Sequence, residues 1–321
     1  MDPRTSAHVV VAGEALVDLV HGADGAIRAL PGGSPFNVAV GLGRLGVPTA
    51  LLAPLSSDEH GDLLAARLAD ADVRVLPSER TARPTTSATV RLDADGHATY
   101  TFALDGTSAA AMTDGELRAA AAEEPAIATA PLHVSLGAVT LTAPGTGELL
   151  ARLLDDAARR PFVSLDPNVR PAVIGDLATA RAAIARAVAC VDLVKVSDAD
   201  LLTLHPDRDP LAVAGDWARS GPALVVVTRG AEGATAVRTD AGTLTVAGVP
   251  VDVVDTVGAG DAFTSGLLAG LDERGLLDRA ALAAADAATL REVLSFAARV
   301  AAITCTRDGA DPPRRAEVDA G

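Results

Sequence analysis

The chain is poor in lysine, cysteine and histidine, and each shortage excludes a class of protein. Lys195 is the only lysine among 321 residues, so no Gly-Lys-Ser or Gly-Lys-Thr triplet exists and a P-loop nucleotide site is excluded. Two cysteines, Cys190 and Cys305, cannot build a disulfide framework, and such sparse use fits a reducing compartment. The six histidines are scattered without the spacing of a metal pair, so we expect no zinc site.

Positive charge and long apolar runs are also scarce. The net charge of −15 argues against nonspecific binding to a nucleic acid backbone. No apolar run reaches the length of a membrane span, and the N-terminal residues lack a basic segment followed by an apolar one. We therefore expect a cytoplasmic protein with neither nucleic-acid nor membrane partners. The 49% hydrophobic content with 2% aromatic residues predicts a globular core of alanine, valine and leucine.

Short β-branched runs alternate with segments of helical spacing along most of the chain. The runs cover residues 8–13, 132–136, 162–166, 191–196 and 223–228, and helical segments include 145–159 and 176–188. This alternation predicts an α/β fold with a mostly parallel, doubly wound sheet covered by helices, whose strand ends gather ligands along one edge. We expect a single domain over residues 1–311 and a poorly ordered tail over 312–321.

Two stretches break this rhythm. Residues 17–30 carry turn residues around Gly22 and Gly25, and residues 86–103 alternate apolar and polar side chains on both sides of a turn at 93–96. Such alternation is typical of a hairpin with one solvated face. We expect these lid segments, about 15–31 and 85–105, to form a small β-sheet that stands off the main sheet and acts as a lid.

The run from Asp255 to Gly266 carries the strongest chemical signal. It places Gly258, Ala259 and Gly260 immediately before a carboxylate, Asp261, at the start of an apolar helix. Unpaired amides at a helix N-terminus attract phosphate, and glycine lets a ligand approach the backbone. A carboxylate among these donors fits a general base beside a transferring phosphoryl group. The alternative is a capped core helix with an aspartate in its first turn.

A second glycine-rich segment lies near the N-terminus. Gly32 and Gly33 permit close approach of a ligand, and Asn37 can donate to and accept from hydroxyl groups. Asp18, just after the first predicted strand, can accept hydrogen bonds from a polyol. The alternative interpretation of this segment is a turn followed by a helix cap.

The same helix contains a misleading match to a dinucleotide fingerprint. Gly41, Gly43 and Gly46 have the spacing G-x-G-x-x-G. That fingerprint must follow a strand and open a helix, whereas the residues before Gly41 already have helical spacing and Gly46 is placed as a C-cap. A nicotinamide site is therefore not expected.

Together the two segments resemble the two signatures of the ribokinase-like, or PfkB, carbohydrate kinases, over nearly the whole chain from about His8 to Pro312. The second signature matches throughout, and the first is looser. The resemblance implies a ribokinase-like fold, ATP and Mg²⁺ as cofactors, and K⁺ as an activator. It also implies that Asp261 takes the proton from a sugar hydroxyl and that the amides of Gly258, Ala259 and Gly260 hold the transferring phosphoryl group.

Further roles follow from the resemblance. Sugar-binding residues would be Asp18, Gly32, Gly33, Asn37, Tyr100, Phe102 and Arg170. Nucleotide-binding residues would be Lys195, Ser197, Asp200, Thr228, Gly230 and Gly233. Monovalent cation ligands would be Asp255, Val257 and Gly309. Tyr100 and Phe102 fit packing within the lid equally well.

The chain departs from the family pattern where Asn-x-x-Glu is common near the Mg²⁺–phosphate region. Here the stretch is Ser197-Asp198-Ala199-Asp200, in which Asp200 keeps the charge on a shorter arm and Asp198 is an alternative. The departure leaves the Mg²⁺ contacts open.

The substrate is indicated less directly than the reaction. The segment Asp166-Pro-Asn-Val-Arg170 resembles those of fructokinases and 2-keto-3-deoxygluconate kinases. The lid strand from Tyr100 to Gly106 has no arginine for a substrate carboxylate, and an unpaired carboxylate in a closed site is costly, so a neutral ketohexose such as fructose is favoured. Alternatives are 2-keto-3-deoxygluconate kinase, ribokinase, nucleoside kinase and a non-catalytic sugar- or nucleotide-binding relative. We also expect a homodimer formed through the lid.

Overall fold

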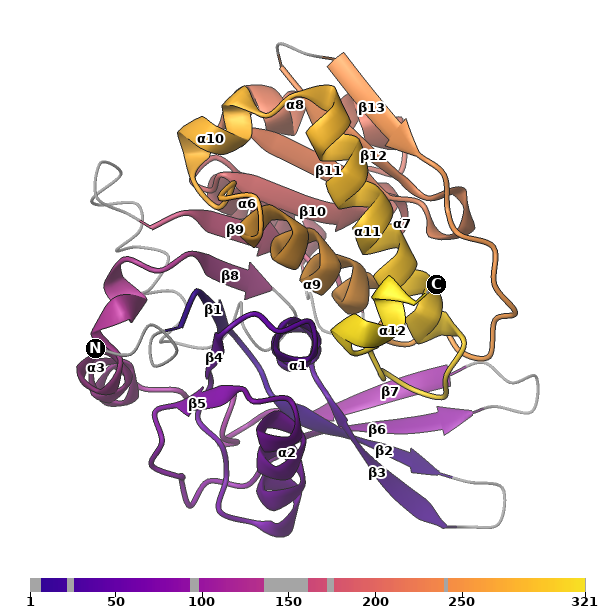
Figure 1. Ribbon diagram of the computed structural model, residues 1–321. Helices are drawn as coiled ribbons and strands as arrows, with labels where there is room; N and C mark the ends of the chain where they lie inside the picture. Colours follow the sequence, from indigo (N-terminus) through magenta and orange to yellow (C-terminus); the bar gives the residue numbers. More distant parts are fainter. Residues whose placement is uncertain are drawn as a thin grey trace.

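The computed structural model describes residues 7–21, 26–92, 98–135, 161–171, 176–239 and 242–320. Within these ranges a nine-stranded sheet runs through the molecule in the order β13-β12-β11-β10-β9-β8-β1-β4-β5 (Figure 1). Its parallel strands are β1 (Val9–Ala12), β4 (Thr49–Leu52), β5 (Arg74–Leu76), β8 (Leu132–Ser135), β9 (Val163–Asp166), β10 (Leu193–Ser197) and β11 (Leu224–Thr228). The antiparallel edge strands are β12 (Ala234–Arg238) and β13 (Gly242–Val246).

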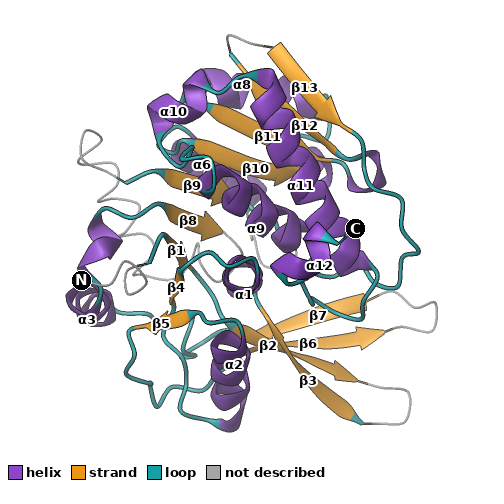
Figure 2. Ribbon diagram, in the orientation of Figure 1, coloured by secondary structure: helices purple, strands orange, loops and turns teal. Residues whose placement is uncertain are grey.

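Helices cover both faces of this sheet (Figure 2). One apolar core includes residues of α1 (Ser34–Arg44), α2 (Glu59–Asp70), α9 (Ala259–Asp272), α10 (Arg279–Ala284), α11 (Ala287–Cys305) and α12 (Arg315–Asp319). The other includes residues of α3 (Asp114–Glu123), α6 (Leu177–Val188), α7 (Asp198–Leu204) and α8 (Pro210–Ser220). Short 3₁₀ turns are η2 (Pro125–Ala128) and η3 (Gly230–Glu232).

Strand β1 is apolar at every position because both of its faces are buried. Val9 and Val11 belong to one core, and Val10 and Ala12 belong to the other, with each side chain at most 2% exposed. Successive strand residues point to opposite faces, so a strand that is covered on both sides needs an apolar residue at every position. The five runs predicted from the sequence correspond to β1, β8, β9, β10 and β11, which confirms the parallel sheet.

A separate four-stranded sheet has the order β3-β2-β6-β7. Its strands are β2 (Leu16–His21), β3 (Ile27–Gly32), β6 (Thr86–Leu92) and β7 (Ala98–Ala103). These are the two stretches predicted as a small additional sheet, and Figure 1 shows them projecting from the main sheet beside α2. The predicted turns at Gly22 and Gly25 and at 93–96, the helix at 145–159 and residue 136 of the second predicted run lie outside the described residues.

The tail that was predicted to be poorly ordered instead packs on the core as α12. Val318 is 1% exposed within the core that α9 and α11 share. Asp311 makes ion pairs with Arg44, Arg67 and Arg307, and the Arg315 guanidinium lies 5.0 Å from the centre of the Phe296 ring. The prolines and arginines suggested a solvated tail, but Pro312, Pro313 and Val318 are buried, and Arg314 and Glu317 form ion pairs with Asp70 and Arg307.

The misleading dinucleotide match is confirmed as helix packing. Gly41 and Gly43 lie inside α1, where an added Cβ would be 2.4 Å from Ser265 Oγ and 2.1 Å from the Ala71 carbonyl oxygen, respectively. Gly46 follows the helix at φ 85°, in the left-handed region that a helix end requires. Gly41 and Gly43 therefore allow close contacts with neighbouring elements, and Gly46 allows the helix to end. None of the helices in the described ranges is both long and apolar enough to cross a membrane.

Candidate active site

Helix α9 begins with backbone amides that are available to an anion. Its N-cap, Gly258, has φ 75°, and an added Cβ would lie 2.6 Å from Cβ of Ala310, so only glycine fits. The Ala259 amide donates to the Thr256 carbonyl oxygen at 3.2 Å. The amides of Gly258, Gly260 and Asp261 have no hydrogen-bond partner among the described residues. Such amides at the positive end of a helix are suited to bind a phosphoryl group.

The Asp261 carboxylate is held in place by α1. Ser34 Oγ donates to Asp261 Oδ1 at 2.7 Å, and Asn37 Nδ2 donates to Asp261 Oδ2 at 2.9 Å. Ser34 opens α1 immediately after Gly33, and Asn37 lies one turn later on the same face. Burial raises the pKa of Asp261, whereas these two hydrogen bonds and the nearby Lys195 act in the opposite direction. A carboxylate in this setting can accept a proton.

A buried ion pair lies beside the helix terminus. Lys195 Nζ donates to Asp166 Oδ2 at 2.9 Å, with side chains 6% and 3% exposed. An added Cβ on Gly260 would lie 3.1 Å from Lys195 Nζ, so the ammonium group is adjacent to the amide-bearing turn. Desolvation lowers the pKa of Lys195, but Asp166, Asp261 and Asp200 together raise it, and the net shift is upward. The lysine therefore stays charged.

Further polar groups connect this pair to Asp261. Ser135 Oγ donates to Ser34 Oγ at 3.0 Å, and Asn168 Nδ2 lies 3.2 Å from Ser135 Oγ. The backbone N–H of Asn168 donates to Asp166 Oδ1 at 3.0 Å. The predicted site did not include Ser34, Ser135, Asp166 or Asn168. A signal was present, because Ser135 and Asp166 are polar residues that end buried parallel strands, where ligands gather in folds of this class.

The sugar-side residues of the predicted site lie on the small sheet and around the start of α1. Asp18 in β2 faces Gly32, where an added Cβ would be 2.6 Å from Asp18 Oδ2. Gly33 has φ 99°, and an added Cβ would be 2.9 Å from the Glu14 carbonyl oxygen. Burial raises the pKa of Asp18 to about 6, opposed by the charge of Arg170, which is itself exposed.

The two aromatic residues of the predicted site both belong to β7. Tyr100 is paired with Val90, and Phe102 is paired with Ala88 and half-buried. Their positions place the residues on the small sheet.

The predicted nucleotide residues follow the next strands along the same carboxyl edge. Ser197 caps α7, and its Oγ accepts from the Asp200 amide at 3.0 Å. Burial and the charge of Asp166 raise the pKa of Asp200. Thr228 ends β11. Gly230 and Gly233 have φ 51° and 94° around the turn η3.

The predicted cation ligands come together at a loop beside α9. Asp255 Oδ1 accepts from the Val257 amide at 3.1 Å, and Oδ2 accepts from the Gly309 amide at 2.9 Å. Asp255 is half-buried and Val257 is 48% exposed. The carboxylate thus ties the segment before α9 to the one after α11.

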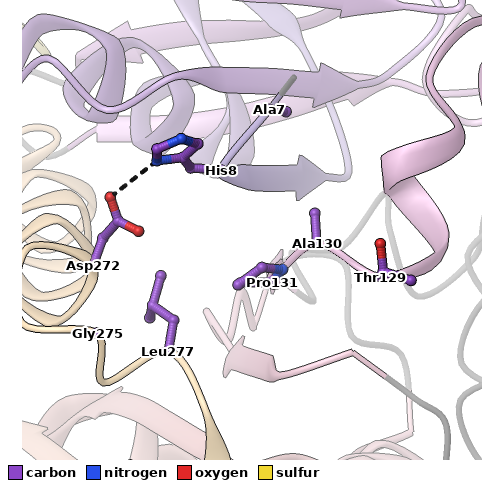
Figure 3. Close-up of a pocket in the computed structure, with 8 residues that line it drawn as sticks. All are labelled: Ala7, His8, Thr129, Ala130, Pro131, Asp272, Gly275 and Leu277. Atoms are coloured by element: carbon purple, nitrogen blue, oxygen red, sulfur yellow. Dashed lines mark ion pairs between the residues drawn. The ribbon is translucent and has the colours of Figure 1, made fainter. Parts of the chain in front are cut away.

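A cavity of about 400 Å³ lies elsewhere, at the amino ends of the strands (Figure 3). His8 and Asp272 line it and form an ion pair at 3.6 Å, with Pro131 across the opening. Because His8 and Pro131 precede β1 and β8, this cavity is on the edge opposite to the residues described above. Within the described ranges, no group of three or more His, Cys, Asp or Glu side chains is arranged to hold a metal ion.

Comparison with known proteins agrees with this geometry. Residues 6–316 match the profile of the pfkB family carbohydrate kinases. The chain belongs to this family. It is similar to a fructokinase from Rhizobium leguminosarum bv. trifolii, at 38% identity over 288 residues that cover 88% of this chain and 85% of the relative.

Solved structures extend the likeness to the fold. A double mutant of Vibrio cholerae O395 fructokinase, in a form with fructose, ADP and potassium ion bound, has a TM-score of 0.77 and 27% identity, covering 98% of this chain and 97% of the other. Aminoimidazole riboside kinase from Salmonella enterica, complexed with aminoimidazole riboside and an ATP analogue, has a TM-score of 0.78 and 25% identity, covering 97% and 98%. The pfkB-family chain therefore has the ribokinase-like fold predicted from its sequence, and it is a carbohydrate kinase.

Proposed function

We propose that this carbohydrate kinase is an ATP-dependent fructokinase with Asp261 as its general base. The observation that carries the proposal is the carboxylate of Asp261, held by Ser34 and Asn37 beside the unpartnered amides of Gly258 and Gly260. The fructokinase relatives, together with fructose and ADP in the Vibrio cholerae enzyme, support this substrate assignment.

The reaction follows from this arrangement. Asp261 removes the proton of a sugar hydroxyl as its oxygen bonds to the γ-phosphorus of ATP, and the bond from that phosphorus to the β–γ bridging oxygen breaks. ADP leaves with the electron pair, and the proton stays on Asp261 until it is lost to solvent. The amides of Gly258, Ala259 and Gly260 stabilise charge on the moving group, with Ala259 first releasing its bond to Thr256.

The remaining roles divide between the two substrates. Asp18, Gly32, Gly33 and Asn37 hold sugar hydroxyls, with Tyr100, Phe102 and Arg170 shaping the sugar side. Lys195, Ser197, Asp200, Thr228, Gly230 and Gly233 hold the nucleotide. The small sheet closes over the sugar and excludes water, which limits wasteful hydrolysis of ATP.

Two cations are part of the proposal. Mg²⁺ would neutralise phosphate charge and reach the protein through Asp200, a half-buried carboxylate whose oxygens suit a hard cation. K⁺ would lie against Asp255 with the carbonyl groups of Val257 and Gly309, an all-oxygen set that suits a hard cation. We also propose a cytoplasmic location and a homodimer through the small sheet, whose end strands β3 and β7 lack an outer neighbour among the described residues.

The test is ADP release measured over fructose, other ketoses, pentoses, 2-keto-3-deoxygluconate and nucleosides, with Asp261→Asn alongside. Turnover should be greatest on fructose, and Asp261→Asn should lose about 10²–10⁴-fold in kcat, the usual contribution of a general base. Near-full activity of Asp261→Asn would remove the base from the mechanism. A greater kcat/KM on the sugar acid or a riboside would reassign the substrate, and ATP binding without any turnover would make the chain a binding protein.

A further inference from the structure

A series of hydrogen bonds leads from the buried ion pair to the carboxylate of Asp261. It runs from Asn168 Nδ2 to Ser135 Oγ, from Ser135 Oγ to Ser34 Oγ, and from Ser34 Oγ to Asp261 Oδ1, over 3.2, 3.0 and 2.7 Å. Ser34, Ser135 and Asn168 are 6%, 0% and 8% exposed, so water does not compete for these groups. The three residues come from α1, β8 and the turn after β9.

The direction of these hydrogen bonds is determined by the chemistry of the groups. An ionised carboxylate only accepts hydrogen bonds, so Ser34 must donate its single hydroxyl proton to Asp261. The contact between Ser34 and Ser135 then requires the proton of Ser135. Ser135 has no proton left for Asn168, so Asn168 must present its amide NH₂ group. All three bonds therefore donate toward Asp261.

The first donor of the series is oriented by the ion pair. Asn168 has φ 42°, an unusual backbone conformation for a residue with a side chain, and its backbone N–H donates to Asp166 Oδ1. The other oxygen of Asp166 accepts from Lys195. Because the Lys195–Asp166 pair is buried, the turn that carries Asn168 has little freedom to reorient its side chain.

We propose that Ser34, Ser135 and Asn168 are positioning residues, which hold the Asp261 carboxylate ionised and aimed at the substrate through a one-way series of donated hydrogen bonds. The proposal rests on the role of Asp261 as the general base. It accounts for Asp166 and Asn168 in the segment Asp166-Pro-Asn-Val-Arg170, to which the proposed sugar and nucleotide contacts assign no role.

The surroundings of Asp261 explain why such help is needed. Burial raises the pKa of Asp261, and the charge of Asp166 on β9 acts in the same direction. The hydrogen bonds from Ser34 and Asn37 on α1 and the charge of Lys195 on β10 oppose this rise. Since α1 contributes only neutral groups here, Ser34 and Asn37 must favour the ionised form through hydrogen bonding alone.

The experiment measures kcat against pH for the full chain and for Ser34→Ala, Ser135→Ala and Ser34→Thr. Ser34→Ala removes the hydrogen bond donated to Asp261, and the acidic limb of the kcat profile should therefore move to higher pH by about one unit. At a pH on that limb kcat falls about tenfold, whereas on the plateau it stays within about threefold. Ser135→Ala should move the limb in the same direction by less, and Ser34→Thr, which keeps a hydroxyl, should restore it.

Two further variants make the outcomes distinguishable. Thr49→Val removes another buried hydroxyl, which donates to the Val47 carbonyl oxygen at the amino end of β4, and it should leave the limb unmoved. Asp261→Asn reports on the general base itself. If Asp261→Asn is inactive but neither serine variant moves the limb, or Thr49→Val moves it equally, the positioning series is overturned and the base remains. If Asp261→Asn stays active, the proposed function fails.

Discussion

Asp18 should be a residue whose charge destabilises the folded protein. Burial raises the pKa of its carboxyl from 3.8 to about 6, with only the charge of Arg170 in opposition. The charged form is therefore disfavoured by folding. The resulting cost is fully present above pH 6, declines as the pH falls through the folded pKa, and vanishes below 3.8, where both states are protonated. Replacing Asp18 by asparagine should accordingly stabilise the protein at neutral pH.

The size of this effect follows from the same shift. A pKa difference of about two units corresponds to about 3 kcal/mol at pH 7.5, and linkage reduces it to about 1 kcal/mol at pH 4.5. An unfolding entropy of about 2.1 cal/mol/K per residue over this chain amounts to about 0.7 kcal/mol/K. Since asparagine must itself be desolvated, a gain of about 1–3 kcal/mol is expected, which raises the Tm by about 2–4 °C at pH 7.5.

The assay compares thermal unfolding of the parent and Asp18→Asn at pH 4.5, 6.0 and 7.5. Asp207→Asn is the matched control, because it removes the same charge from an exposed position and should leave Tm nearly unchanged. Activity should move the other way, with a higher KM for fructose, because a carboxylate is the stronger acceptor for a sugar hydroxyl. A variant that is no more stable at pH 7.5, or whose gain does not shrink at pH 4.5, would refute the reasoning.

Two more variants test the backbone and the C-terminal segment. Gly258→Ala should lower the free energy of unfolding by about 1–2 kcal/mol, because a Cβ is disfavoured at positive φ and would also clash with Ala310. The Tm and kcat should both fall. An unchanged kcat would show that this turn takes no part in the chemistry. Asp311→Asn should cost about 0.5–1 kcal/mol at neutral pH, a screened value for a partly exposed ion-pair group. Arg67 and Arg44 hold the pKa of Asp311 below 3.8 against desolvation, so the deficit measured by denaturation should be constant above that pH and shrink as the pH falls through the folded pKa.

The sequence predicted what local patterns encode. Continuous β-branched runs located β1, β8, β9, β10 and β11, because strands buried on both faces need apolar residues at every position. Alternating apolar and polar residues located the small sheet, because a sheet with one solvated face needs apolar residues only on its other face. The strands β4 and β5 and the hairpin of β12 and β13 were not predicted, since their residues form no distinctive pattern.

The pairing between distant residues could not be predicted from such patterns. Ser34 and Asp261 are separated by 227 positions, and only the fold shows that one donates to the other. Asp311 lies just before the predicted tail, and its three arginine partners come from α1, α2 and the turn after α11, so no local pattern could show these contacts. Glycines were easier to interpret, since a glycine in a turn, such as Gly258 or Gly33, suggests a positive φ from the sequence alone. The residues that lie against them in space, Ala310 and Glu14, could not be predicted.

The two central carboxylates, Asp18 and Asp261, differ in the hydrogen bonds that they accept from neighbouring residues. Burial raises the pKa of both Asp18 and Asp261, yet Asp261 accepts two hydrogen bonds while no described residue donates one to Asp18. A carboxylate without protein donors keeps its lone pairs for a ligand, and one with fixed donors keeps its orientation. If Asp18 binds the sugar as proposed, it exchanges solvent for sugar hydroxyls, and its burial costs stability in the empty protein. The two hydrogen bonds that fix the Asp261 carboxylate do not involve a ligand, which suits the general base that we propose.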